Sequence, residues 1–297
     1  MLFSVVYLEG VFLQILLRGV LVGGVYALLS VGLTLIFGVL DIPHFAYGDI
    51  MMLAMYTCFW LQFFTNMPLF PLLSIIFPLY LLVGFIIYRV IVSRLMEKPA
   101  LSKILFMVGL SLFLQGLALF LWSADTRFVK SELEGLYVTI GEGKISLTYI
   151  VNFIAAMVFF LGFYIWLQRT FMGKAIRASA QNRELALATG INIQKVFLIS
   201  FGIATAMSAV GATLFAPTYY VGPFVGIELT LKSFMIIVLG GLGSVEGALI
   251  GGLIIGIVEA FSSYFLSSEV KELAALIIFM GILLFRPKGL LGKEVKE

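Results

Sequence analysis

Long apolar runs recur along the whole chain and leave few ways for it to fold. An apolar helix of about 20 residues crosses a hydrocarbon core of about 30 Å, and several runs reach that length. Only 12% of the 297 residues carry a charge, against about 25% in an ordinary soluble domain. We therefore expect an all-α, polytopic transmembrane helical bundle that takes up residues 1–297 as a single domain.

The expected bundle has eight or nine membrane segments, some of them short or broken. The run 229–265 is too long for one crossing, and glycines interrupt it at 240–252. If it crosses twice, the total is nine. The other segments are expected at 11–40, 50–64, 70–92, 104–122, 149–167, 196–216 and 273–285.

Basic residues gather in the loop 89–103, in the segment 168–195 and in the tail 286–297. Because cytoplasmic loops carry an excess of Lys and Arg, all three are predicted to be cytoplasmic. The charges of loop 123–148 nearly cancel, which favours an external position, and its alternating second half predicts a small β-hairpin. Counting crossings then places the C-terminus in the cytoplasm and the N-terminus outside. The first ten residues lack a basic region and a small-residue cleavage site, so no removable signal peptide is expected.

The segment 168–195 is the longest basic stretch, with five Lys or Arg residues and one acid, Glu184. It has no proline and is rich in alanine, which predicts a helix from Gly173 to Gly190. Gly190 is suited to end that helix, because glycine adopts the left-handed cap conformation easily. Two interpretations remain open: a solvated positive-inside loop, and a short helix on which another protein docks.

Glycines break two apolar regions, 38–48 and 240–252. Paired interruptions in the two halves of a transporter are typical of a translocation pathway, although tight turns at the membrane faces would look the same. The lone His44, beside Pro43, is either a satisfied turn residue or part of such a pathway. Ionisable residues inside apolar sequence are functional candidates. Glu259 lies deepest, whereas Lys232 is placed near a helix start and is expected to snorkel.

Several kinds of chemistry are excluded. One histidine and one cysteine, Cys58, cannot form a disulfide framework or a Cys/His metal site. The sequence contains neither a G-x-x-x-x-G-K-[ST] loop nor an H-E-x-x-H motif. We therefore expect a protein that is not an enzyme and holds no cofactor. The net charge of +3 lies in a few loops. It indicates how the chain is oriented in the membrane and gives no reason to expect a nucleic-acid partner.

Taken together, several stretches resemble the permease subunits of branched-chain amino-acid (Liv-type) ABC importers. They are GGVYALLSVGLTLIFGVLDIPHFAYGD at 23–49, FMGKAIRASAQNRELALATGINIQKV at 171–196, VLGGLGSVEGALIGGLIIGIVEA at 238–260 and FRPKGLLG at 285–292. The likeness covers nearly the whole chain.

The resemblance implies partners. Two ABC ATPase subunits would bind ATP and Mg²⁺, a second homologous permease or a second copy would complete the membrane domain, and a periplasmic or lipid-anchored protein would deliver the solute. The expected location is a prokaryotic plasma (inner) membrane, in contact with its lipid. A cytoplasmic coupling helix in 168–195 would contact the ATPase through Gly173, Arg177, Arg183, Glu184, Ala186, Ala188 and Gly190. The pathway candidates are His44, Phe45, Tyr47, Gly48, Gly240, Gly241, Gly243 and Glu259.

One departure bears on the solute. Where the family usually has Asn-Phe-Ala-His-Gly, this chain has His-Phe-Ala-Tyr-Gly at 44–48. Leucine, isoleucine and valine are the default solutes, carried by ATP-driven alternating access. Urea, short amides and aromatic acids are alternatives within the family. An ion-coupled secondary transporter and an intramembrane enzyme are rival classes, and the second has no catalytic pair to support it.

Overall fold

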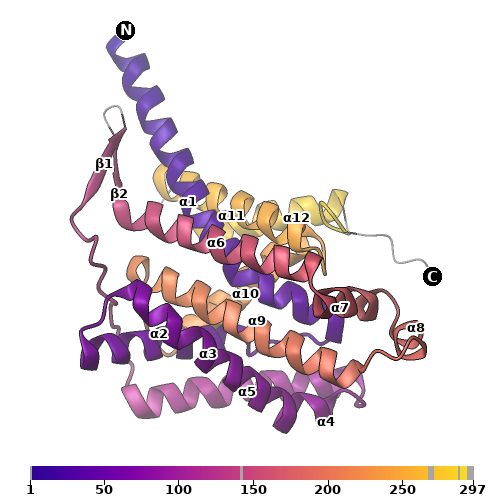
Figure 1. The fold of residues 1–297 in the computed structure, drawn as a ribbon. Helices are drawn as coiled ribbons and strands as arrows, with labels where there is room; N and C mark the ends of the chain where they lie inside the picture. Colours follow the sequence, from indigo (N-terminus) through magenta and orange to yellow (C-terminus); the bar gives the residue numbers. More distant parts are fainter. Residues whose placement is uncertain (1, 141–142, 267–270, 287, 293–297) are drawn as a thin grey trace.

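The computed structural model describes residues 2–140, 143–266, 271–286 and 288–292. Within them the chain is a helical bundle with one two-stranded sheet (Figure 1). The strands are β1 (Tyr137–Ile140) and β2 (Gly143–Ser146). The helices are α1 (Leu2–Leu40), α2 (Tyr47–Thr65), α3 (Leu69–Ile87), the π-helical turn η1 (Tyr88–Val92), α4 (Ser93–Leu95), α5 (Ala100–Trp122), α6 (Leu147–Arg169), α7 (Phe171–Gln181), α8 (Arg183–Ala188), α9 (Ile193–Phe215), the 3₁₀ turn η2 (Ala216–Thr218), α10 (Val225–Gly240), α11 (Val245–Phe265) and α12 (Lys271–Phe285).

Six helical stretches among the described residues are long and apolar enough to cross a membrane, which confirms the predicted all-α polytopic bundle. They are Gly10–Leu40, Leu69–Leu95, Ala100–Trp122, Leu147–Arg169, Ile193–Thr218 and Val245–Phe265. The run 229–265 is indeed broken into two helices, α10 and α11. The total of eight or nine crossings stays a prediction, because α2, α10 and α12 are shorter or less apolar than these six.

Two helices form the centre of the bundle. In the most apolar 18-residue segments of α1 and α9, 78% and 83% of the residues are buried, whereas the corresponding segments of the other four stretches are only 17–33% buried. Figure 1 shows α1 running diagonally through the molecule, and it packs against α11, α9, α6 and α10. The outer helices α3, α5, α6 and α12 therefore carry most of the apolar surface that lipid or another subunit would cover.

The crossing of α1 and α11 depends on glycines spaced four residues apart on each helix. A Cβ atom on Gly256 would lie 2.5 Å from the carbonyl oxygen of Gly19 and from the Cα of Gly23. A Cβ on Gly252 would lie 2.6 Å from the backbone nitrogen of Ala27. Small residues at this spacing allow helix backbones in lipid to approach closely, so a side chain at either position would push α11 off the central helix.

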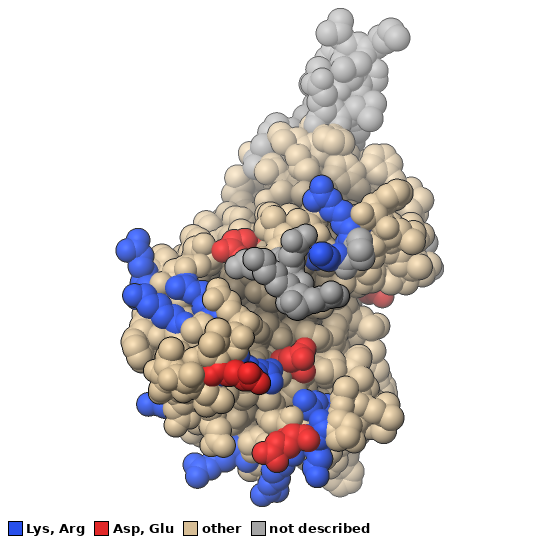
Figure 2. Space-filling model, turned by 90° about the vertical axis from the view of Figure 1, so that its right-hand side faces the viewer, with Lys and Arg blue, Asp and Glu red and all other residues tan. Residues whose placement is uncertain are grey.

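The three basic segments lie at one end of the molecule. Figure 1 shows α4, α7 and α8 together at the right-hand end, far from the hairpin and the start of α1. The described part of the tail reaches the same end, since the backbone N–H of Leu291 donates to the carbonyl oxygen of Gly240 at 2.9 Å. Figure 2 looks onto this end, where Lys and Arg side chains are spread with Asp and Glu between them. We call it the basic end.

The predicted hairpin is confirmed at the opposite end. β1 and β2 pair antiparallel, with Tyr137 opposite Ser146. The loop that precedes them is tied to the link between α9 and α10, because Arg127 and Val221 exchange two backbone hydrogen bonds of 2.9 and 2.8 Å. The first part of loop 123–148 is therefore fixed to the link between two of the long helices.

Candidate functional site

The basic segment after α6 forms two helices, so the single helix predicted from Gly173 to Gly190 is wrong in this respect. Asn182 separates α7 from α8, and its side chain accepts a hydrogen bond of 3.0 Å from the Leu185 backbone N–H. Asparagine is favoured as an N-cap because it satisfies a backbone donor that the helix leaves free. Gly190 does end the segment in a left-handed conformation, with φ of 83°.

The first of these helices lies against the bundle. α7 buries Gly173, Ala175, Ile176 and Ser179 and contacts α6, α9 and α1. A Cβ on Gly173 would meet the backbone of Leu167 at the end of α6. Predicted coupling residues on α7 are thus partly structural: Gly173 permits the close approach, and the Arg177 guanidinium binds the side-chain oxygen of Gln168.

The second helix presents an apolar surface at the basic end. Leu185 and Leu187 are 65% and 57% exposed, whereas Ala186 between them is only 3% exposed. Glu184 and Ala188 are exposed as well. Of the predicted coupling residues on α8, Glu184 and Ala188 are open to a partner and Ala186 packs inward. Leu185 and Leu187 were not among the residues predicted from the sequence, and no local pattern singled them out.

Arg183 connects this helix to the centre of the bundle. Its guanidinium donates to the carbonyl oxygen of Val39 at 3.1 Å, near the C-terminal end of α1, and lies 5.1 Å from the ring centroid of Phe197 on α9. A carbonyl in the last turn of a helix has no partner within that helix, and the helix dipole makes a cation favourable there. Arg183 therefore joins α8 to both central helices.

The segment between α1 and α2 turns back into the bundle. The Tyr47 hydroxyl donates to the carbonyl oxygen of Leu29 at 2.7 Å, and about 16 Å of helix separates Leu29 from Leu40 at 1.5 Å per residue. His44 is fully buried and stacks on Phe201 of α9, with ring centroids 5.3 Å apart. Irregular backbone at membrane depth is tolerated only where protein or water covers it. Protein covers His44 in this interruption, and the choice between a pathway element and a tight turn at the membrane face stays a prediction.

The next residues fix the start of α2 against α10. The ring of Phe45 stacks on Phe234, with centroids 5.3 Å apart, and the backbone N–H of Gly48 donates to the Thr230 hydroxyl at 2.9 Å. Neither ring nitrogen of His44 has a hydrogen-bond partner among the described residues. The predicted pathway residues of this stretch therefore form a packed element inside the bundle.

The second interruption is a tight turn at the basic end. Gly241 and Gly243 have φ values of 107° and 79°, which other residues rarely adopt. The tail covers this turn through its hydrogen bond to Gly240. A Cβ on Gly38 would lie 3.1 Å from the Cα of Gly243. The two interruptions thus meet at this pair, although His44 to Gly48 lie deeper.

Glu259 belongs to a buried ion pair. Its Oε1 atom is 2.9 Å from the Nζ atom of Lys232 on α10, and its Oε2 atom accepts a 2.7 Å hydrogen bond from the Tyr26 hydroxyl of α1. The same hydroxyl accepts a bond of 3.0 Å from Lys232. The expectation that Lys232 snorkels is wrong, because the residue is 5% exposed and paired. In the sequence, the opposite charges of Lys232 and Glu259 on two consecutive apolar segments could have indicated this pair.

A small cavity of about 110 Å³ lies beside this pair. Arg18, Tyr26, Tyr149, Tyr219 and Glu259 contribute polar groups to its lining. The Arg18 guanidinium donates to the Tyr149 hydroxyl at 3.4 Å and lies 5.4 Å from the centroid of that ring. The cavity therefore has a cation and an anion in one lining; we call it the ion-pair cavity.

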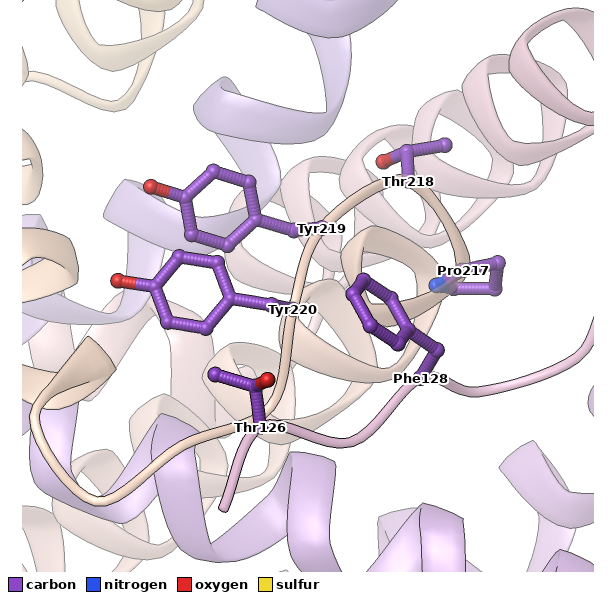
Figure 3. Close-up of a pocket in the computed structure, with 6 residues that line it drawn as sticks. All are labelled: Thr126, Phe128, Pro217, Thr218, Tyr219 and Tyr220. Carbon is purple, nitrogen blue, oxygen red and sulfur yellow. The ribbon is translucent and has the colours of Figure 1, made fainter. Parts of the chain in front are cut away.

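A larger open pocket of about 550 Å³ adjoins it, and both are lined by Thr218 and Tyr219. Figure 3 shows Tyr219 and Tyr220 side by side, with both rings projecting the same way. Their hydroxyls donate to the Glu228 carboxylate at 2.6 and 2.7 Å. Burial and the hydrogen bond to Glu228 raise the pKa of Tyr220 to about 12 and raise that of Tyr219 as well. Both hydroxyls therefore remain donors at neutral pH.

Comparison with known proteins assigns the chain to a family. Residues 15–285 match the family described as the permease component of branched-chain amino acid transport systems. The chain belongs to this permease family. The match includes the basic segment with α7 and α8, both interruptions and the ion-pair cavity.

Individual relatives cover the permease over nearly its full length. It is 30% identical to the high-affinity branched-chain amino acid transport system permease protein BraD of Pseudomonas aeruginosa, over 96% of this chain and 97% of BraD. It is 31% identical to the LivH permease protein of Escherichia coli K12, with the same two coverages. A probable LivH of Methanocaldococcus jannaschii is 28% identical over 96% of this chain and 94% of its own length. No solved structure matches the permease.

Proposed function

We propose that this permease is the transmembrane subunit of a binding-protein-dependent ABC importer in a prokaryotic inner membrane, and that its solutes are leucine, isoleucine and valine. Family membership and two bacterial relatives named as branched-chain amino acid permeases support this proposal. The chain would work with two ABC ATPase subunits, a homologous permease or a second copy of itself, and a solute-binding protein.

The observation that carries the proposal is the apolar surface of α8. Leu185 and Leu187 are exposed on a helix at the basic end, whose positive charge favours a cytoplasmic position. Apolar side chains on a short helix in water are typical of a helix that inserts into a groove of a partner. The coupling helix therefore comprises α7 and α8, with α8 as the part that the ATPase subunit binds.

The contacts of this segment suggest how a movement is transmitted. ATP and Mg²⁺ would bind in the ATPase subunits, and their closure would displace α8. Arg183 would pass the displacement to Val39 and Phe197, and hence to α1 and α9. Because these are the two most buried helices, their tilting would rearrange the whole bundle and open it alternately to either side.

The same proposal assigns the crossings. Residues 41–46 return from the basic end into the bundle, so α2 needs to complete only the rest of a crossing. With α10, α11 and α12 counted, the chain crosses nine times, with the N-terminus outside and the C-terminus in the cytoplasm. The hairpin and the open pocket of Tyr219 and Tyr220 would then face the binding protein.

Coupling can be tested by co-purifying the native complex in mild detergent. The double variant Leu185→Glu/Leu187→Glu should lose the nucleotide-hydrolysing subunit. Leu136→Glu is the matched control, since Leu136 is 51% exposed on the loop at the opposite end, and it should retain the subunit. A complex that keeps its ATPase in the double variant would refute the docking role of α8.

The solute and the energy source need separate measurements. Ligand screening of the co-purified binding protein would distinguish leucine, isoleucine and valine from urea, short amides and other amino acids. An ion-coupled secondary transporter would lose uptake when ion gradients are collapsed in the presence of ATP, whereas the proposed importer would not.

A further inference from the structure

The ion-pair cavity has more charged groups than a structural ion pair requires. Lys232 and Glu259 already neutralise each other at 2.9 Å. Arg18 adds a second cation to the same lining and forms no ion pair within the described ranges. A guanidinium has five N–H donors, and among the described residues that of Arg18 donates to the neutral Tyr149 hydroxyl. Arg18 is exposed, so its guanidinium remains accessible to an anionic group that enters the cavity.

The opposite charge is available in the same cavity. The two oxygens of a carboxylate can accept about four hydrogen bonds, and Glu259 uses one oxygen for Lys232 and the other for Tyr26. Glu259 also lines the cavity directly, so it can accept a further donor. A ligand with both a carboxylate and an ammonium group would satisfy Arg18 and Glu259 together.

The remaining lining suits an aliphatic side chain. Val22, Phe215 and Gly256 contribute apolar surface between the charged groups. Gly256 has no side chain because α1 and α11 approach closely there. The volume of about 110 Å³ corresponds to roughly four waters at about 30 Å³ each. It holds only part of an amino acid, and the rest of the solute would extend into the adjoining open pocket of about 550 Å³.

The cavity also has an approach from the end of the molecule that carries the hairpin. Thr218 and Tyr219 line both the ion-pair cavity and the open pocket in Figure 3. Arg18 lies about 33 Å along α1 from Leu40 at 1.5 Å per residue, which is near the outer edge of a membrane of about 30 Å. A solute released into the open pocket would therefore reach Arg18 first and Glu259 further in.

We propose that the ion-pair cavity is a transient binding site for the zwitterion of an aliphatic amino acid. Arg18 binds the α-carboxylate, Glu259 accepts from the α-ammonium group, and Val22 and Phe215 contact the side chain. This inference rests on the proposed function for its external orientation and its solute class. The site would hold the solute after the binding protein releases it and before the bundle opens to the cytoplasm.

Protection of a single cysteine tests the proposal directly. Cys58 is buried in α2 and is replaced by alanine, and Ser263, which lines the cavity, is changed to cysteine. A membrane-impermeant methanethiosulfonate then labels the complex in vesicles with the hairpin end outward. Leucine at three times its dissociation constant should slow labelling about fourfold, by simple occupancy. Two analogues with one charge each, 4-methylpentanoate and 3-methylbutylamine, should protect far less.

Matched variants complete the test. Ser123→Cys, on the exposed loop and outside the cavity lining, should label at the same rate with or without leucine. Arg18→Gln should abolish the protection at Ser263→Cys. The proposal is overturned if leucine gives no protection, or if either singly charged analogue protects as well as leucine.

ATP-driven leucine uptake, measured in the same vesicles, separates this inference from the proposed function. Uptake without protection would refute the cavity site alone. Protection without ATP-driven uptake would support the site and refute the importer.

Discussion

Replacing Lys232 by methionine should reveal how much the buried ion pair contributes to the free energy of unfolding. Its Nζ atom lies 2.9 Å from Oε1 of Glu259, and both side chains are 6% exposed. Two unit charges at that distance attract by about 6 kcal/mol at an effective dielectric constant of about 20. This attraction offsets much of the cost of removing both groups from water. Methionine has a similar length, so the variant keeps the packing and leaves Glu259 without its cation.

The variant leaves the Glu259 carboxylate buried without its cation. Because removing one partner of a buried ion pair typically costs about 3–5 kcal/mol, we expect Lys232→Met to lower the free energy of unfolding by about that amount. The double variant Lys232→Met/Glu259→Gln loses both charges and keeps an acceptor for Tyr26, so it should lie within about 1 kcal/mol of the parent.

Equilibrium unfolding of the purified permease in detergent measures these differences. Lys98→Met is the control, because Lys98 is exposed at the basic end and its loss should cost nearly nothing. Equal destabilisation of the single and double variants would refute the reasoning.

Three further predictions concern packing and coupling. In a thermal unfolding assay, Gly256→Leu should destabilise the permease by more than about 3 kcal/mol, because a Cβ at this position meets the backbone of α1 at 2.5 Å. In the same assay the control Gly281→Ala should be neutral or stabilising, because Gly281 has open space around it. Arg183→Ala removes the contact to Val39, so the number of leucine molecules carried per ATP hydrolysed should fall while hydrolysis continues. Asn182→Ala removes an N-cap that typically contributes about 1 kcal/mol, and faster amide exchange confined to α8 would reveal it.

The sequence was informative wherever one local signal decided the outcome. The apolar runs predicted the membrane helices, and the alternating stretch of loop 123–148 predicted the hairpin. The glycines of 240–252 predicted the break between α10 and α11, because the turn needs the positive φ values of Gly241 and Gly243. Gly190 ended its helical segment for the same reason.

The features that failed depend on partners far away in the chain. Lys232 looks like a snorkelling residue until Glu259 and Tyr26 are brought to it from α11 and α1. The sequence of 41–46 left a turn at the membrane face and a pathway element both open, and it could not show that His44 packs on α9 and Phe45 on α10. The inward packing of Ala186 likewise depends on how α8 sits on the bundle, which no local pattern encodes.

The close approach of Gly38 and Gly243 has a mechanical consequence. With no side chains between them, the end of α1 and the turn before α11 touch almost backbone to backbone, so there is no compliant layer to absorb a small displacement. Arg183 donates a hydrogen bond to Val39 of α1, one residue after Gly38. A displacement of α8 would consequently be transmitted through the end of α1 to the turn before α11, with no side chains between the two backbones to absorb it.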